Sequence, residues 1–356
     1  MSFMNKDVLI KMEAEKKYPL EIKDVPPEEQ AEVHKYLTNA KPDYIRMGST
    51  GYFFPDGLKE ICNKIYNMEV RPNDVFVVTF PKSGTTWVQE LVWLIGNDLD
   101  YKTASNVQLF QRFPFLEFTM VLRSPKINKW LGERVETDPK LRPFYESFTR
   151  NSRSDATIFK APSPRFIKSH LPFSLLPPTL LDTAKVVYVA RDPRDAAVSY
   201  YHHCRMMLLH GFGGDFRAFW NLFINNKVDY TPYEAHIKEA WEKRHHPNML
   251  FLFYEELSKD LPAAVRRVSQ FLNKPVTEEQ VMRLCDHLHF DNFRKNMSVN
   301  MDIFKHIGLI NKDDHFIRKG KAGGWRDYFD EEMTQQAERW MKEKLGDTVQ
   351  FPICKI

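Results

Sequence analysis

Four short runs of apolar, β-branched and aromatic residues recur along the chain. They cover Val75–Phe80, Arg165–Lys168, Lys185–Ala190 and Met249–Tyr254. Runs of this length and composition are typical of buried strands. Segments with helical spacing lie between them, and strands that alternate with helices are typical of a parallel sheet covered on both faces. The pattern therefore predicts a doubly wound α/β fold: one domain with a central parallel sheet flanked by helices.

The helical segments are recognised by apolar residues that recur every three or four positions. The clearest ones are Thr85–Asn97, Tyr233–His245 and Leu261–Leu272. In the first, Val88, Leu91, Val92 and Ile95 fall on one face, which is the pattern of a helix packed on a core.

The first 45 residues have a different composition, rich in Lys and Glu. Pro26 and Pro27 followed by Glu28 and Glu29 predict the start of a helix, since proline and acids suit its exposed amides. We expect residues 1–45 to form an N-terminal arm with one helix, and residues 46–356 to form the single domain.

Composition narrows the class of protein. The 356 residues are 43% hydrophobic, which is enough for a large core and excludes a disordered chain. The net charge of +4 is too mild to indicate nucleic-acid binding. No apolar run reaches the roughly 18 residues of a membrane span, and the charged start lacks the apolar centre of a signal peptide. We therefore expect a cytoplasmic protein without a membrane span.

The four cysteines, Cys62, Cys204, Cys285 and Cys354, stand far apart. No C-x-x-C pair occurs, so neither a disulfide framework nor a structural zinc site is expected.

The strongest chemical signal follows the first predicted strand, where residues 79–87 read TFPKSGTTW. A strand, a tight glycine turn and a helix together present free backbone amides and a positive helix end to an anion. Lys82 adds a positive charge, and the hydroxyls add donors. The segment is not a Walker A loop, because its lysine precedes Gly84. It predicts a P-loop-like site for a phosphate or sulfate group.

A second cluster begins at Arg191, directly after the run that ends at Ala190. The carboxyl ends of parallel strands form the ligand crevice, so Arg191 is placed to meet an anion. Ser199 follows eight residues later, about two helical turns on. A surface ion pair between Arg191 and Asp195 is the alternative.

A third cluster, Lys168-Ser169-His170, closes another predicted strand. A histidine beside a lysine at a strand end is a candidate general base for group transfer. The adjacent pairs His202-His203 and His245-His246 lack the spacing of helical metal ligands, so we assign them to packing or the surface.

The fourth cluster, residues 318–325, reads RKGKAGGW. Three cations and three glycines in eight residues predict a loop that folds over a polyanion, and a basic surface loop is the alternative.

Together these clusters resemble the cytosolic sulfotransferase family over roughly residues 70–345. The family's TYPKSGTTW loop is present with Phe80 in place of tyrosine. Its KSHLP, RDPRDxxVSYY, LFYE and RKGxxGxW segments begin at Lys168, Arg191, Leu252 and Arg318. The chain is most similar to the insect branch, which includes sulfotransferases and a retinol dehydratase.

The resemblance implies transfer of a sulfo group from 3′-phosphoadenylyl sulfate (PAPS) to a hydroxyl or amine, with adenosine 3′,5′-bisphosphate (PAP) as the product and no metal. His170 would be the catalytic base, with Lys82 and Lys168 steadying the transferring group. The phosphosulfate would be held by Lys82, Ser83, Gly84, Thr85 and Thr86. The adenine would be held by Trp87, Tyr254, Leu288, Phe290 and Phe293. The 3′-phosphate would be held by Arg191, Ser199, Arg318, Lys319 and Gly320.

The chain departs from the family pattern at two places. Leu288 stands where many relatives have a threonine that contacts the adenine, so that contact is open. The family's KxxxTVxxxE dimer motif should follow Trp325, but residues 326–331 read RDYFDE. The oligomeric state is therefore not assigned.

The acceptor site is expected between Trp87 and His170. The aromatic run from Phe110 to Phe118 suits an apolar pocket, and Phe115 and Phe118 match acceptor-wall phenylalanines of the family. With Lys168 and His170 they would contact a small apolar acceptor such as a phenol, steroid or retinoid. A role in the core alone is the alternative for this run.

An insert, about residues 123–157, interrupts this region. Its aromatics alternate with charges, and Pro125, Pro139 and Pro143 divide it, which predicts one or two short amphipathic helices. We expect a lid over the acceptor mouth, with a solvated loop as the alternative.

Three alternative functions make different predictions. A nucleotide or sugar kinase would need a Walker A lysine after the glycine and an aspartate for Mg²⁺. A non-catalytic nucleotide carrier would be expected to lack Lys82 or His170. A dehydratase of the retinol type would sulfonate an allylic alcohol and then expel sulfate, and the sequence does not separate it from a simple transferase.

Overall fold

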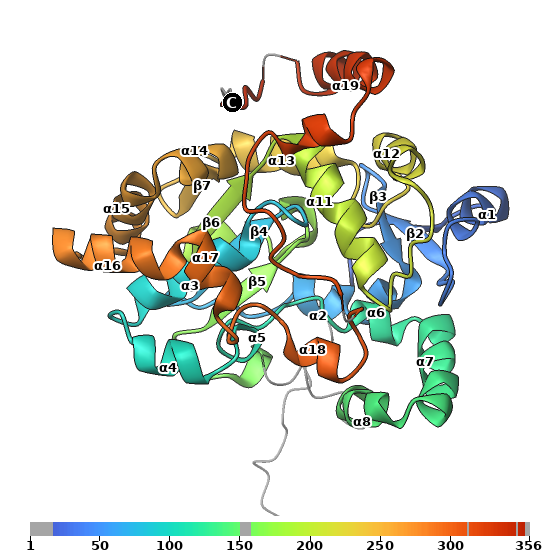
Figure 1. Ribbon diagram of the computed structural model, residues 1–356, viewed down its shortest axis with the longest axis horizontal. Helices are drawn as coiled ribbons and strands as arrows, with labels where there is room; N and C mark the ends of the chain where they lie inside the picture. The colour runs from blue at the N-terminus through green and yellow to red at the C-terminus, as the bar shows by residue number, and fades with distance from the viewer. Residues whose placement is uncertain (1–16, 150–157, 312, 347, 353–356) are drawn as a thin grey trace, which may run out of the picture.

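Four parallel strands form the centre of the computed structural model, which describes residues 17–149, 158–311, 313–346 and 348–352 (Figure 1). They are β4 (Val75–Thr79), β5 (Phe166–Ser169), β6 (Lys185–Ala190) and β7 (Met249–Phe253). Each corresponds to one predicted run, shifted by at most one residue. The strand order is β5-β4-β6-β7, with every neighbouring pair parallel, so the predicted α/β class is confirmed.

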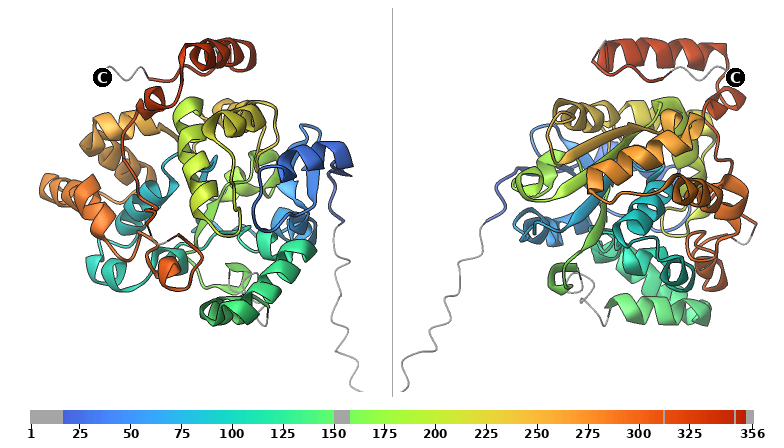
Figure 2. Two further views of the ribbon diagram at one scale, coloured as in Figure 1. Left: turned by 45° about the vertical axis from the view of Figure 1, so that its right-hand side comes forward. Right: turned by 90° about the vertical axis from the view of Figure 1, so that its left-hand side faces the viewer.

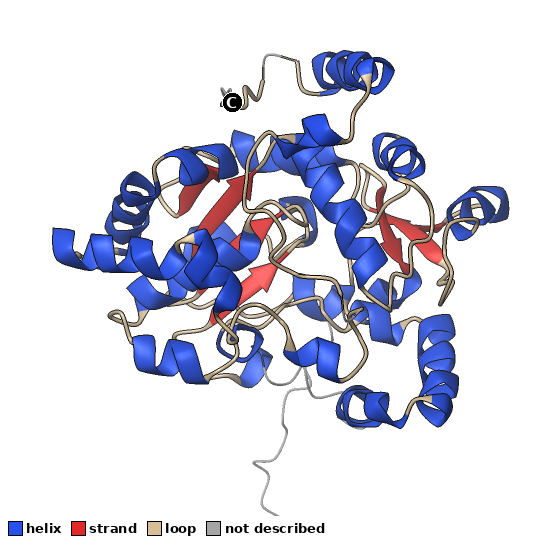
Figure 3. Cartoon of the chain, viewed as in Figure 1, coloured by secondary structure: helices blue, strands red, loops and turns tan. Residues whose placement is uncertain are grey.

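Alternate side chains of the sheet point to two separate cores. In β4, Phe76 and Val78 face one core and Val77 faces the other, as the period of a strand requires. Helices cover both faces of the sheet (Figure 3). The helices on the Val77 side are α3 (Thr85–Gly96), α15 (Leu261–Leu272) and α16 (Glu278–Leu288). Those on the Phe76 side are α11 (Pro193–Met206), α12 (Phe216–Ile224) and α13 (Tyr233–Glu242).

The strand order decides where a ligand can bind. The chain passes from β4 to β5 on one side and then crosses back over β4 to β6. The carboxyl ends of β4 and β6 therefore lie at a topological switch point, where open α/β sheets bind ligands. The loop after Thr79 and the Arg191 segment both emerge at this edge.

A second, antiparallel sheet was not predicted. It contains β1 (Ile22–Asp24), β2 (Tyr44–Met47) and β3 (Tyr52–Pro55). The expected boundary between arm and domain at residue 45 falls inside β2. The helix expected near Pro26 is present as α1 (Pro27–His34), and residues 1–16 lie outside the described part of the chain.

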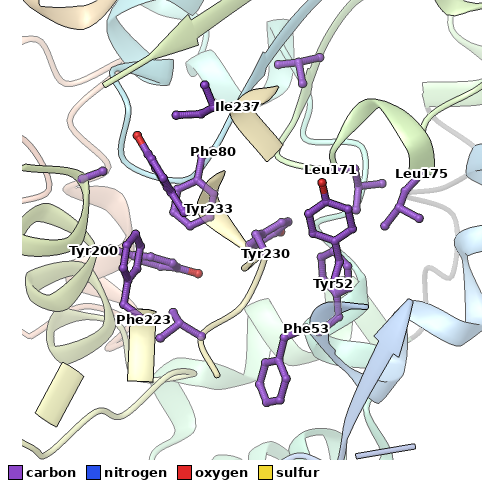
Figure 4. Packing of buried hydrophobic residues seen from close by; sticks show 14 of the residues in the cluster. Tyr52, Phe53, Phe80, Leu171, Leu175, Tyr200, Phe223, Tyr230, Tyr233 and Ile237 are labelled. Atoms are coloured by element: carbon purple, nitrogen blue, oxygen red, sulfur yellow. The ribbon is translucent and has the colours of Figure 1, made fainter. Parts of the chain in front are cut away.

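The antiparallel sheet is joined to the main core through β3. Backbone hydrogen bonds link Phe53 to Thr231 and Tyr230, each at 2.8 Å. Phe53 and Tyr52 are fully buried, and the close-up of this core shows them beside the aromatic residues of the central domain (Figure 4). The N-terminal strands thus contribute to the same core as the catalytic sheet.

The insert is helical where it is described. It contains α6 (Met120–Arg123), α7 (Pro125–Thr137), a 3₁₀ turn at Pro139–Leu141 and α8 (Arg142–Thr149). The prediction of short amphipathic helices is confirmed for this part, and residues 150–157 lie outside the described residues. Leu131 and Phe144 are buried in a third apolar cluster with Leu209 and Leu309, which fixes the insert to the domain.

The remaining elements surround this framework. The helices are α2 (Cys62–Tyr66), α4 (Tyr101–Asn106), α5 (Leu109–Arg112), α10 (Leu180–Thr183), α14 (Tyr254–Lys259), α17 (Phe290–Lys295), α18 (Ile303–His306) and α19 (Glu331–Lys344). Further 3₁₀ turns are Asp56–Glu60, Phe173–Leu175 and Gly324–Asp327. Figure 2 shows α19 at the outer edge, away from the insert. No helix in the described ranges is long and apolar enough to cross a membrane.

Candidate active site

One cavity of about 860 Å³ lies at the carboxyl edge of the parallel sheet. Its volume is in the range of small-molecule sites. Apart from Ser83, which lies in the loop beneath, every predicted site residue lines it. The lining residues among them are Lys82, Gly84, Thr85, Thr86, Trp87, Phe115, Phe118, Lys168, His170, Arg191, Ser199, Tyr254, Leu288, Phe290, Phe293, Arg318, Lys319 and Gly320.

The loop between β4 and α3 takes a conformation that needs its glycine. Lys82 has φ of 66° and Gly84 has φ of 102°, in the left-handed region that disfavours side chains. A Cβ atom on Gly84 would also lie 2.7 Å from Cδ2 of Tyr254. The Oγ1 atoms of Thr79 and Thr85 lie 2.7 Å apart and brace the turn. Gly84, the residue directly before α3, therefore packs against the ring of Tyr254.

The predicted adenine residues form one aromatic corner of the cavity. Trp87 Nε1 donates a hydrogen bond to the Leu288 carbonyl oxygen at 3.0 Å, and the Trp87 and Tyr254 ring centroids are 5.9 Å apart. The Leu288 side chain is buried, so this residue contributes its carbonyl to holding Trp87. A Cβ on Gly320 would lie 2.2 Å from Cδ2 of Phe290, so the basic loop approaches the corner as closely as glycine permits.

Arg191 lies between the two predicted phosphate loops. Its Nη1 donates to the Lys82 carbonyl oxygen at 3.0 Å, and its Nη2 donates to the Lys321 carbonyl oxygen at 3.1 Å. The guanidinium also stacks on Tyr254, 4.1 Å from the ring centroid. Arg191 is 8% exposed, so the alternative of a surface ion pair with Asp195 is wrong.

Asp195 instead anchors the basic loop. Its carboxylate accepts hydrogen bonds from the backbone amides of Gly323 and Trp325, at 2.5 and 2.9 Å. Trp325 is further covered by the guanidinium of Arg194, 3.9 Å from a ring centroid. These contacts fix residues 318–324 across the mouth of the cavity.

The cavity concentrates positive charge. Burial, together with the charges of Lys168 and Arg191, lowers the pKa of Lys82 to about 7. Burial likewise lowers the pKa of Lys168 to about 8. The protonated forms of these two lysines are disfavoured in the free protein. A bound anion stabilises the protonated forms and so raises both pKa values.

His170 is held in one tautomer by the end of β4. Its Nδ1 lies 2.8 Å from the carbonyl oxygen of Thr79 and 3.1 Å from the Thr79 hydroxyl. A carbonyl oxygen only accepts, so Nδ1 carries the proton and Nε2 presents a lone pair. Burial and the charge of Lys168 hold the pKa of His170 well below its usual range, which keeps the imidazole neutral. A neutral imidazole of fixed orientation can accept a proton at Nε2.

The apolar half of the cavity begins at this imidazole. The Phe115 ring lies 5.1 Å from the ring of His170 and 6.0 Å from that of Phe118, between centroids. The Lys168 ammonium lies 4.2 Å from the Phe115 centroid. Pro143 and Phe144 of α8 also line the cavity, so the insert reaches the acceptor side.

Two acidic residues of the site were not predicted. Glu117, fully buried, accepts a hydrogen bond from the His170 backbone amide at 2.6 Å. Glu255 accepts from the Asp192 amide at 2.9 Å, beside Arg191. Glu117 was visible in the sequence as a lone acid within the apolar run Phe115–Phe118, whereas Glu255 follows an apolar run and stands beside Glu256, so the sequence did not single it out.

The residues present fit PAPS as the anionic co-substrate. Ser83 Oγ and Arg191 Nε are buried polar atoms with no hydrogen-bond partner among the described residues. Such atoms are costly unless a ligand satisfies them. They lie at the two loops predicted to hold the phosphosulfate and the 3′-phosphate, between the close-approach glycines Gly84 and Gly320. Within the described ranges, no group of three or more His, Cys, Asp or Glu residues could hold a metal ion.

Comparisons with known proteins agree with this geometry. The sulfotransferase domain family matches residues 72–349. The luciferin sulfotransferase of Photinus pyralis is 37% identical over 312 residues, 85% of this chain and 80% of the relative. The sulfotransferase 1A1 of Bos taurus is 31% identical over 288 residues, 81% of this chain and 88% of the relative.

A retinol dehydratase, solved in a complex with retinol and PAP, superposes with a TM-score of 0.87 at 44% sequence identity, covering 94% of this chain and 99% of that one. It was also solved with androsterone and PAP, with a TM-score of 0.88. The chain therefore belongs to the sulfotransferase family and is a PAPS-dependent sulfotransferase.

Proposed function

We propose that this enzyme sulfonates the hydroxyl of an extended apolar alcohol or phenol, with His170 as the general base. The observation that carries the proposal is the position of His170, between the cationic and the aromatic halves of one cavity. An acceptor hydroxyl directed at Nε2 would have its apolar body against Phe115 and Phe118. Lys82 and the phosphosulfate loop would lie on the other side.

When bound, PAPS supplies an activated sulfo group and a good leaving phosphate. The protein's part is to orient the reactants and to stabilise charge, because transfer through a loose transition state needs little covalent help. His170 would take the hydroxyl proton at Nε2. Lys82 would offset the charge that develops on the leaving oxygen, and Lys168 would steady the transferring group.

The acceptor class follows from the shape and lining of the cavity. Aromatic side chains from three separate segments face it, including Phe113, Phe144 and Phe304. Relatives named for luciferin, and solved structures that contain retinol or androsterone, support acceptors that are apolar and elongated. We assign this chain the same broad class, a small apolar molecule with one reactive hydroxyl.

The likeness to retinol dehydratase favours a second candidate. An acceptor that is an allylic alcohol could lose sulfate after transfer, which would leave a dehydrated product. The structural superposition at 44% identity is the observation behind this candidate. A kinase is set aside by the family match. A non-catalytic carrier would leave the PAPS in the assay below unconsumed.

One experiment tests both candidates. The enzyme is incubated with ³⁵S-labelled PAPS and paired saturated and allylic alcohols, phenols, steroids and retinoids, and products are identified by mass spectrometry. Sulfate esters support the transferase, and free labelled sulfate with a dehydrated product supports the dehydratase. PAP formation without either product would contradict both. A cytoplasmic location stays a prediction from the sequence, and the oligomeric state stays unassigned.

A further inference from the structure

Glu117 connects the acceptor wall to the segment that carries His170. The segment before it pairs with that strand: Lys168 N donates to the Pro114 carbonyl at 2.9 Å, and Leu116 N donates to the Lys168 carbonyl at 2.8 Å. Phe115 thus sits beside Lys168 on a short parallel ladder. The backbone segment that carries Phe115 is therefore hydrogen-bonded to the segment that leads to His170.

The Glu117 carboxylate adds two hydrogen bonds next to this pair of backbone segments. Its Oε1 accepts from the His170 amide at 2.6 Å, and its Oε2 accepts from Ser169 Oγ at 2.8 Å. The same Ser169 oxygen accepts from the Leu171 amide at 3.0 Å. Both carboxylate oxygens are therefore engaged as acceptors, one by Ser169 and one by His170, which matches the ionised form.

The charge of Glu117 also acts on its neighbours. The titratable groups that face it are Lys168, His170 and Tyr230. Its negative charge raises the pKa of Lys168, against the lowering effect of burial. Burial raises the pKa of Glu117 itself to about 7, although the two hydrogen bonds and Lys168 oppose that rise. A fully buried acid is costly for the fold, so a functional reason for it is worth testing.

We propose that Glu117 is a positioning residue for sulfo transfer: its carboxylate fixes the backbone of His170 relative to the acceptor wall. This inference rests on the proposed role of His170. It predicts two separable effects. Loss of the hydrogen-bond acceptors displaces the base, and loss of the charge alone neutralises Lys168 at a lower pH.

The test compares four variants of the full chain. Glu117→Gln keeps an acceptor for the His170 amide and removes the charge, whereas Glu117→Ala removes both. Ser169→Ala removes one hydrogen bond and keeps the charge. Glu239→Gln is the matched control, because Glu239 also accepts from a serine amide and hydroxyl, those of Ser174 at 2.8 and 2.9 Å, but lies outside the cavity.

The measurements are kcat as a function of pH, PAP affinity by calorimetry and thermal unfolding. We expect Glu117→Ala to lower kcat by about 10²-fold, as small misplacements of reacting groups do. In Glu117→Gln, the alkaline limb of the pH profile of kcat should move down by about one pH unit. Removing the neighbouring negative charge lowers the pKa of Lys168 by about that amount. Ser169→Ala and Glu239→Gln should leave that limb in place, and PAP affinity should change less than about twofold in all four.

A Glu117→Gln variant with wild-type kcat and an unmoved alkaline limb would overturn the inference. So would a rate loss matched by an equal loss of PAP affinity or folding, because the role would then be structural. If Glu117→Ala does not fold, Glu117→Gln carries the test alone. Retained activity in His170→Ala would refute the proposed base directly, without reference to Glu117.

Discussion

The Nδ1 atom of His170 lies 2.8 Å from the carbonyl oxygen of Thr79, the last residue of β4. This contact joins the ends of two neighbouring strands, because His170 directly follows β5. It fixes the proton on Nδ1 and presents Nε2 to the cavity as an acceptor. The strand that leads into the phosphosulfate loop therefore also sets the tautomer of the proposed base.

Replacing His170 should stop chemistry without stopping nucleotide binding. We expect His170→Ala to lower kcat by about 10²–10⁴-fold, the usual contribution of a general base. PAP affinity, measured by calorimetry, should stay close to that of the wild type, because the imidazole faces the acceptor side. His245→Ala, at an exposed position, is the control. Near-wild-type turnover of an unactivated phenol by His170→Ala would contradict the assignment.

Nucleotide binding should be accompanied by proton uptake at alkaline pH. Lys82 and Lys168 have pKa values of about 7 and 8 in the free protein, so both are partly neutral at pH 8. An anion beside them raises both pKa values, and the protein then binds protons. Calorimetry of PAP binding in buffers of different ionisation enthalpy measures this uptake at pH 8, and it should shrink towards pH 6.

The matched variants for this titration are Lys82→Ala and Lys185→Ala. Burial also lowers the pKa of Lys185, but this lysine lies at the opposite end of β6 from the cavity. Uptake at pH 8 should fall in Lys82→Ala and persist in Lys185→Ala. Equal uptake in both would show that the 5′-phosphate of PAP does not meet Lys82.

Arg191 should determine the preference for a nucleotide with a 3′-phosphate. Arg191→Ala should weaken PAPS binding and reduce its advantage over the nucleotide that lacks this phosphate, while Lys82→Ala should mainly lower turnover. A charged, buried hydrogen bond of this kind is worth roughly 1.5–3 kcal/mol, about 10–100-fold in affinity. Equal binding of both nucleotides by the wild type would show that the Arg191 site is misassigned.

The close packing of Gly84 on Tyr254 should make this position intolerant of a side chain. Gly84→Ala places a Cβ 2.7 Å from a fixed aromatic ring at φ of 102°. We expect PAP affinity to fall at least tenfold with only modest loss of thermal stability. Gly51→Ala is the control for backbone strain alone, since Gly51 has φ of 73° and its nearest neighbour lies 3.8 Å away. A similar effect of both variants on PAP binding would refute the packing argument.

The insert should control which acceptors bind. Phe144→Ala removes a cavity-lining ring of α8, so KM for long apolar acceptors should rise about tenfold more than KM for a simple phenol. Trp130→Ala, on α7 in the same apolar cluster but away from the cavity, is the control. Limited proteolysis between Arg123 and Arg153 should slow with PAP and an apolar acceptor. Equal cleavage with and without them, together with unchanged KM ratios, would exclude a lid.

Sequence reasoning succeeded where local chemistry is decisive. The run before Thr79 and the glycine at position 84 were enough to predict a strand, a glycine turn and the start of α3, because backbone propensity and turn geometry are local. The helix over Leu261–Leu272 was predicted to the residue for the same reason. The antiparallel sheet was missed because β1, β2 and β3 are three or four residues long, and pairing between strands leaves little pattern in such short runs.

The sequence by itself determined the fold class and the order of the strands along the chain, since each depends on a contiguous pattern. Only the tertiary structure brought Glu117 to the backbone of His170, 53 residues away, and directed Arg191 to the Lys82 carbonyl rather than to Asp195. The reason is physical: burial, partner choice and pKa depend on what surrounds a group in space. A parallel sheet brings residues together at its carboxyl edge that are distant in sequence.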